Sequence, residues 1–109
     1  PQGPDIAAAL GPVNRIAGRD LPPGLLGLPV APDALVVIRP EGIIPDVTAP
    51  VRARVVASRL TGPMSRLVLN IGNLQLTSLV PRGLAPEAGT ETGLQIDPEL
   101  AFIFASGDS

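Results

Sequence analysis

The Arg39-Pro40-Glu41 segment places two opposite charges around a proline. The proline ring fixes its own φ and keeps the preceding residue extended, so the guanidinium and the carboxylate are held near each other at the end of an apolar run. Two interpretations stay open. Arg39 and Glu41 form a structural ion pair, or they form a contact to a neighbouring domain or subunit.

A second segment whose side chains suit ligand binding contains Gly62, Ser65 and Arg66. If these residues share one tight loop, as we expect, backbone N–H groups, a hydroxyl and a guanidinium face the same space. Such groups suit an oxyanion such as sulfate or molybdate. The alternative is a simple hairpin connection with an exposed arginine.

Other charged residues invite similar hypotheses with simpler alternatives. Arg52, Arg54 and Arg66 would form a basic strip across neighbouring strands, or a solvated face. Asp97 and Glu99 bracket Pro98 and resemble a pair of catalytic carboxylates, but no polar or aromatic partner accompanies them. We therefore expect a turn at this point.

The composition excludes most catalytic chemistry. The chain of 109 residues has no His and no Cys, and all eight basic residues are arginines. No thiol or imidazole can therefore act as nucleophile, base or zinc ligand, and no lysine can bind phosphate in a P-loop. We expect no catalytic residue, no metal site and no cofactor in this chain. Its net charge of −2 and its aromatic content of 2% also argue against nucleic-acid binding.

The elements that must position these residues are short strands. Fourteen prolines and twelve glycines exclude long helices. We expect an irregular lead-in over residues 1–33, with a helical turn over 6–10 capped by Asp5 and a turn at Pro22-Pro23-Gly24. Apolar and alternating runs predict strands at 13–17, 34–39, 51–60, 66–71, 74–80, 92–96 and 100–104. The pattern indicates an all-β domain over 34–109, a small barrel or sandwich of short antiparallel strands.

Two details of this pattern are specific. In the 51–60 strand, Val51, Ala53, Val55 and Ala57 face one side, and Arg52, Arg54 and Ser58 the other. Gly72-Asn73 predicts a two-residue hairpin turn, because both residue types tolerate positive φ.

Three segments, in this order, resemble the TOBE (transport-associated OB) domains that follow the ATPase domain of importer-type ABC transporters. Val37 to Glu41 is similar to the family's apolar strand and "RPE" element. Val51 to Leu69 resembles its strand, Gly-Pro loop and Arg-Leu strand, and Ala88 to Glu99 resembles its last turn and strand. Ala9 to Asn14 is similar to the "F-L-G-x-x-N" segment that joins the two domains, with Ala9 in place of Phe.

The resemblance implies an OB-like fold and a regulatory C-terminal domain of an importer's ATP-binding subunit. This domain would support subunit dimerisation and modulate transport without catalysis. ATP and magnesium would bind in the parent subunit, upstream of Pro1. The implied partners are the ATPase domain of the same chain, a second copy, and, indirectly, the membrane subunits. The implied location is the cytoplasmic face of the cell membrane. The alternative is a stand-alone OB-like domain that binds an oxyanion such as molybdate or sulfate.

Overall fold

A computed structural model describes residues 13–105 of the chain. This part contains eight strands and four single turns of 3-10 helix. The strands are β1 (Asn14–Ala17), β2 (Leu35–Ile38), β3 (Ile43–Pro45), β4 (Arg52–Thr61), β5 (Met64–Ile71), β6 (Leu74–Pro81), β7 (Glu91–Ile96) and β8 (Ala101–Phe104). The 3-10 turns are η1 (Gly18–Asp20), η2 (Pro40–Gly42), η3 (Arg82–Leu84) and η4 (Pro98–Leu100).

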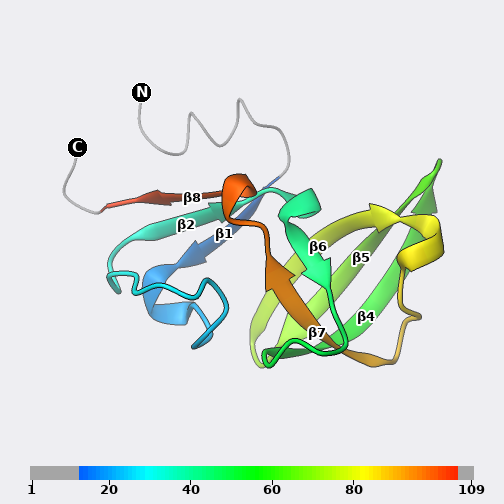
Figure 1. Cartoon of the computed structure of the whole chain (residues 1–109), viewed down its shortest axis with the longest axis horizontal. Helices are drawn as coiled ribbons and strands as arrows, with labels where there is room; N and C mark the ends of the chain where they lie inside the picture. Colours follow the sequence, from blue (N-terminus) through cyan, green and yellow to red (C-terminus); the bar gives the residue numbers. More distant parts are fainter. Residues whose placement is uncertain (1–12, 106–109) are drawn as a thin grey trace.

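The strands form two antiparallel sheets (Figure 1). The smaller sheet has the order β1-β2-β8, and the larger has the order β3-β7-β4-β5-β6. Strands β4, β5 and β6 follow one another through two tight turns, so the largest part of the fold is a local meander. The predicted all-β, OB-like fold of short antiparallel strands is confirmed. The larger sheet is not closed into a barrel by a backbone ladder.

The core is aliphatic, because leucine, valine and isoleucine supply nearly all of its side chains. It joins residues of the small sheet to residues of the large one, and each of the largest has less than 2% of its surface exposed. These are Ile16, Val36, Ile38, Ile43, Val55, Leu67, Leu69, Leu76 and Leu94. β2 is buried on both faces, as its unbroken apolar run predicted.

Asn14 links the two sheets through its side-chain amide. Its Nδ2 donates to the backbone oxygen of Thr77 at 2.8 Å, and its Oδ1 accepts from the Thr77 N–H at 2.6 Å. The same Nδ2 also donates to the Ile38 oxygen at 3.2 Å. Thr77 lies on β6, an edge of the large sheet, so one buried side chain satisfies backbone groups that a further strand would otherwise pair.

A second side chain bridges the two edges of the large sheet. Ser78 on β6 is fully buried, and its hydroxyl donates to the backbone oxygen of Ile43 on β3. β3 and β6 therefore meet through a side-chain hydrogen bond.

The β5–β6 hairpin agrees closely with its sequence pattern. Leu67 and Leu69 are fully buried while Arg66 is exposed, as alternation requires. The turn between β5 and β6 is Gly72-Asn73, also as predicted. Only Gly72 has positive φ, at 59°, which matches a turn of type II′ rather than type I′.

The predicted alternation of β4 is wrong beyond Val55. The register with β5 shifts between Val55 and Ala57, which marks a β-bulge at Val56. Ala53 and Val55 are buried, but every residue from Val56 to Thr61 is exposed, including Ala57. An extra residue in one strand reverses the face of the sheet to which the side chains of the following residues point. Beyond the bulge, β4 also extends past the core.

Some features fall outside the predictions. β3 was not predicted, because three residues ending in proline carry too little alternation. The predicted strand at 13–17 is confirmed as β1, so part of the predicted lead-in belongs to the small sheet. The predicted cap at Asp5 lies outside the described residues, and the boundary at residue 33 stays a prediction. No helix within residues 13–105 has the length and apolar character needed to cross a bilayer.

We expect Asn14→Ala to lower the free energy of unfolding by about 2 kcal/mol, because it leaves the Thr77 N–H and two carbonyl oxygens without their partner. Urea unfolding measures this change. Asn70→Ala is the control, since the Asn70 side chain makes one long and exposed contact, and it is expected to cost less than about 0.5 kcal/mol. Equal losses for the two variants would contradict the linking role of Asn14.

Candidate functional site

The predicted Arg39–Glu41 pair exists and lies on the surface. Arg39 Nη2 is 3.6 Å from Glu41 Oε2, and the two side chains are 38% and 42% exposed. An ion pair this accessible to water contributes about 0–1 kcal/mol to stability. The two charges therefore stay available to an incoming partner at little cost.

The backbone beneath this pair is firmly held. The Arg39 N–H donates to the Leu100 oxygen at 3.0 Å, and the Gly42 N–H donates to the Arg39 oxygen at 2.8 Å. A Cβ on Gly42 would lie 2.8 Å from the Leu100 Cβ, so glycine is needed where η2 and η4 approach. This Arg39–Glu41 corner therefore presents two exposed side chains on a backbone held by hydrogen bonds.

The predicted turn at Asp97-Pro98-Glu99 is confirmed and forms the neighbour of this corner. The Asp97 carboxylate accepts a hydrogen bond from the Glu99 N–H at 3.0 Å, and the Asp97 N–H donates to the Gly42 oxygen at 2.9 Å. Asp97 therefore acts as the N-cap of η4.

The expected loop of Gly62, Ser65 and Arg66 is not present as predicted. The turn contains only Gly62 and Pro63, because Thr61 already pairs with Met64. Gly62 has φ of 68°, which a two-residue turn requires. Ser65 and Arg66 belong to β5, where successive side chains point to opposite faces, so Ser65 is 1% exposed and Arg66 lies outside. The three groups do not converge on a common ligand position.

Arginines collect instead on the outer face of the β4–β5 hairpin. Arg54 and Arg66 are exposed there, and Arg59, which the sequence analysis did not single out, lies directly opposite Arg66 in the register. The alternation pattern alone places Arg59 on the other face. The bulge at Val56 brings it beside Arg66.

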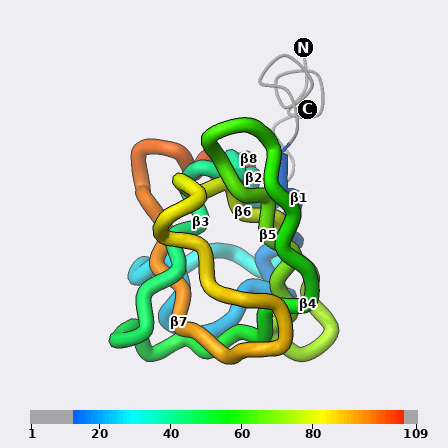
Figure 2. The backbone as a smooth tube through the Cα atoms, turned by 90° about the vertical axis from the view of Figure 1, so that its right-hand side faces the viewer, coloured from blue at the N-terminus to red at the C-terminus, as the bar shows by residue number. Residues whose placement is uncertain are grey.

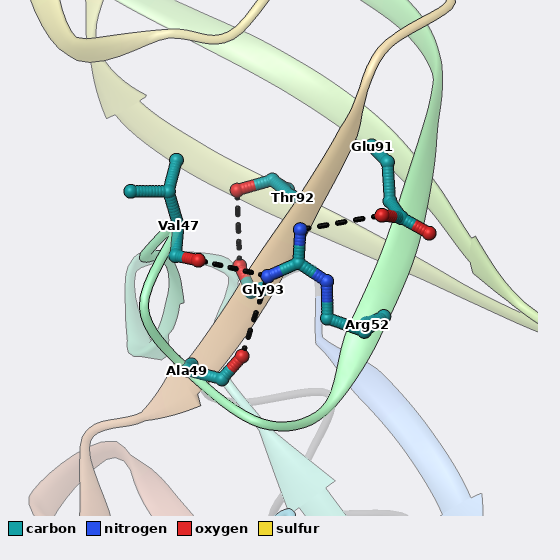
Figure 3. Close-up of polar contacts among 6 residues, drawn as sticks. All are labelled: Val47, Ala49, Arg52, Glu91, Thr92 and Gly93. Carbon is teal, nitrogen blue, oxygen red and sulfur yellow. Dashed lines mark hydrogen bonds and ion pairs between the residues drawn. The ribbon is translucent and has the colours of Figure 1, made fainter.

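Arg52 has a structural task, which Figure 3 shows. Its Nη1 donates to the Val47 oxygen at 2.8 Å and is 3.4 Å from the Ala49 oxygen, and its Nη2 is 3.3 Å from Glu91 Oε1. One guanidinium thus ties the loop between β3 and β4 to β7. Five donors in a planar fork make arginine suited to several acceptors at once.

The same loop is shaped by Asp46 and by Gly93. Asp46 Oδ1 accepts from the Thr48 N–H at 2.9 Å and from the Thr48 hydroxyl at 2.7 Å, and these bonds lower the pKa of its carboxyl. Gly93 lies directly under the loop, where a Cβ would overlap the backbone oxygens of Asp46 and Ala49. The loop therefore packs backbone against backbone.

A shallow hollow of about 260 Å³ lies between η1 and the turn after β5, and it is lined by Asp20, Ile71, Asn73 and Leu74. None of the candidate ligand or interface residues, Arg39, Glu41, Gly62, Ser65 and Arg66, borders it. Among the described residues, no group of three carboxylates is placed to hold a metal ion.

Comparison with models of protein families gives a match. Residues 36–104 match the sequence model of a family described as the TOBE domain. The match runs from β2 to the end of β8, so it includes the Arg39–Glu41 corner and the whole meander. No curated protein matches the chain.

We expect Gly93→Ala to destabilise the domain by about 2 kcal/mol or more, because the added methyl group overlaps two backbone oxygens that cannot move independently. Thermal and urea unfolding measure the loss. Gly83→Ala is the matched control, since Gly83 has open space around its Cβ position and no positive φ. A Gly83 variant as destabilised as the Gly93 variant would contradict the close approach.

Thr48→Ala is expected to raise the pKa of Asp46 toward its ordinary value of 3.8, because the larger of the two lowering hydrogen bonds is lost. A lowered folded-state pKa stabilises the fold above the unfolded pKa, and this contribution disappears as the pH falls through the folded pKa. The stability advantage of the parent chain over the variant should therefore shrink below about pH 4.

Carboxyl carbon chemical shifts measured against pH follow this titration. Thr90→Ala is the control, because its hydroxyl bonds the Glu87 oxygen and does not contact Asp46. An unchanged Asp46 midpoint in Thr48→Ala would contradict the assignment.

Proposed function

Because the chain belongs to the TOBE domain family, we propose that it is the regulatory C-terminal module of the ATP-binding subunit of an ABC-type importer. The single observation that carries this proposal is the family match over residues 36–104. The composition supports it, since a chain without His, Cys or Lys has few groups for chemistry of its own. In this proposal the module supports dimerisation of the subunit and modulates transport, and it performs no catalysis.

The Arg39–Glu41 corner is the part of the module that we propose contacts the rest of the transporter. The pair is exposed, its mutual attraction is weak, and its backbone is fixed by hydrogen bonds to η4. Each of the two side chains can therefore leave this ion pair and bind an opposite charge on a partner, without a rearrangement of the fold. A partner bound in only one state of the ATPase cycle would shift the equilibrium toward that state.

We also propose partners and a location for the module. ATP and magnesium would bind in the ATPase domain of the same chain, and a second copy of the subunit and the membrane subunits would complete the complex. The module would lie on the cytoplasmic face of the membrane. Nucleic acid is not a proposed partner, because the net charge is −2 and aromatic side chains are scarce.

We do not propose the oxyanion-binding alternative. The residues that the sequence suggested for an oxyanion were Gly62, Ser65 and Arg66, whereas Ser65 is buried and Arg66 lies on the opposite face of β5. No observation in the described residues favours a second function.

The proposal is tested first by the coding sequence upstream of Pro1, which is expected to encode an ATPase domain with Walker motifs. The second test uses the full-length subunit reconstituted with its membrane subunits in liposomes. Arg39→Ala with Glu41→Ala is expected to change the coupling of ATP hydrolysis to transport by about fivefold, the effect of about 1 kcal/mol of contact energy. Nucleotide affinity should stay unchanged, because the ATP site lies in another domain.

The control is the double variant Arg19→Ala with Asp20→Ala. It removes the same two charge types from an exposed 3-10 turn at the opposite end of the β1–β2 pair. If the two double variants have the same effect, the corner has no special role. If no ATPase sequence precedes Pro1, the importer context itself is wrong.

A further inference from the structure

One edge of β4 loses its partner halfway along the strand. β7 pairs with Arg52 to Arg54, and the ladder ends where the Val55 N–H donates to the Thr90 oxygen at 2.8 Å and the Val55 oxygen accepts from the Gly89 N–H at 2.7 Å. Within residues 13–105, no strand pairs with this edge of residues 56–61. We call this segment the free β4 edge.

The free β4 edge belongs to an arm that projects from the fold. In Figure 1 the tip of the β4–β5 hairpin forms one end of the molecule, away from β1, β2 and β8, and in Figure 2 it stands at the top. All six residues of the edge are exposed, including Val56 at 48% and Leu60 at 59%. Exposed backbone edges with apolar side chains pair readily with another strand.

The register shows which backbone groups this edge presents. Residues that flank a two-residue turn direct their N–H and C=O groups toward each other, and the direction then alternates along the strand. Thr61 pairs with Met64, so Thr61 and Arg59 direct these groups toward β5. The N–H and C=O groups of Ser58 and Leu60 therefore face outward, spaced to receive an extended chain.

The outer face of the same arm carries an unbalanced charge. Arg59 and Arg66 are cross-strand partners, and like charges in this position are destabilising. The ion pairs among the described residues join other arginines, Arg39 to Glu41 and Arg52 to Glu91. Nothing in this part of the chain offsets the repulsion, so a carboxylate supplied from outside would gain from both guanidinium groups.

We propose that the free β4 edge is a strand-addition site for an extended segment of another polypeptide, with carboxylates that face Arg59 and Arg66. Main-chain hydrogen bonds from Ser58 and Leu60 give affinity, and the two arginines select for acidic side chains. Val56 and Leu60 supply apolar contact. The inference goes beyond the proposed function, because it names a surface and a partner chemistry that do not depend on the importer context.

A second copy of the chain is not the occupant. Two copies paired antiparallel along this edge would bring two Arg59 and two Arg66 side chains onto one face of a continuous sheet. The repulsion that already exists within one arm would increase. Single-stranded nucleic acid is also disfavoured, since the chain has two aromatic residues and both are on β8.

The test uses the isotope-labelled 109-residue chain and a short peptide in which glutamate and valine alternate, with a matched peptide that has lysine in place of glutamate. The acidic peptide is expected to shift the amide signals of residues 56–61 and to bind at least about tenfold more tightly than the basic one. Ser58→Pro is expected to abolish binding, because it removes an outward N–H that is not paired with β5.

Arg59→Gln with Arg66→Gln is the second variant. It is expected to weaken binding of the acidic peptide by about tenfold and, by removing the repulsion, to raise Tm by about 2 °C. A purely structural role for these arginines would lower Tm. Arg54→Gln is the control, because Arg54 lies on the same face where β4 is already paired with β7, and it should change affinity less than about twofold.

Several results would overturn the proposal. They are the absence of shifts at residues 56–61 with millimolar acidic peptide, equal binding of the basic peptide, and preferential binding of poly-uridine RNA or of phosphatidylserine vesicles. Concentration-dependent dimerisation through the same amides would also overturn it, because a second copy would then be the occupant.

Discussion

The buried amide of Asn14 is the interaction on which the union of the two sheets depends. β6 ends the large sheet with free backbone groups, and β1 ends the small one. An added strand would satisfy these groups with a full ladder, but here one side chain donates and accepts like a peptide unit. With the Ser78 hydroxyl on Ile43, it lets an open sheet enclose an aliphatic core. The domain thus uses two polar side chains where a closed barrel uses a strand.

The arginines of the large sheet divide into two groups. Arg52 donates hydrogen bonds to two backbone oxygens and to Glu91, and these bonds stabilise the fold. Arg59 and Arg66 face each other and oppose the fold slightly. We interpret a destabilising pair of arginines without an internal carboxylate partner as a binding site for carboxylates of another molecule. Arg52 thus holds the loop between β3 and β4, whereas Arg59 and Arg66 lie on the projecting arm.

Much of this architecture could be predicted from local pattern. The β5–β6 hairpin from Met64 to Pro81 follows strict alternation and a glycine turn, and both are encoded within a few residues. The bulge at Val56 was not predictable, because only the pairing of β4 with β5 reveals the shift in register. The same difference separates the candidate site residues. Arg39 and Glu41 are neighbours in sequence and form the predicted pair, whereas the positions of Ser65 and Arg59 depend on the turn and the register of the β4–β5 hairpin.

The placement of β2 has a consequence for biosynthesis. β2 pairs with β1 on one side and with β8, the last strand described, on the other. The β4–β5–β6 meander needs only neighbouring segments, so it can form as soon as residues 52–81 have left the ribosome. β2 can pair with β1 early, but its pairing with β8 must wait for the end of the domain, so this edge of β2 stays unpaired until residues 101–104 arrive. A chain interrupted before residue 101 would therefore keep a folded meander beside an unprotected apolar strand, a species prone to aggregation.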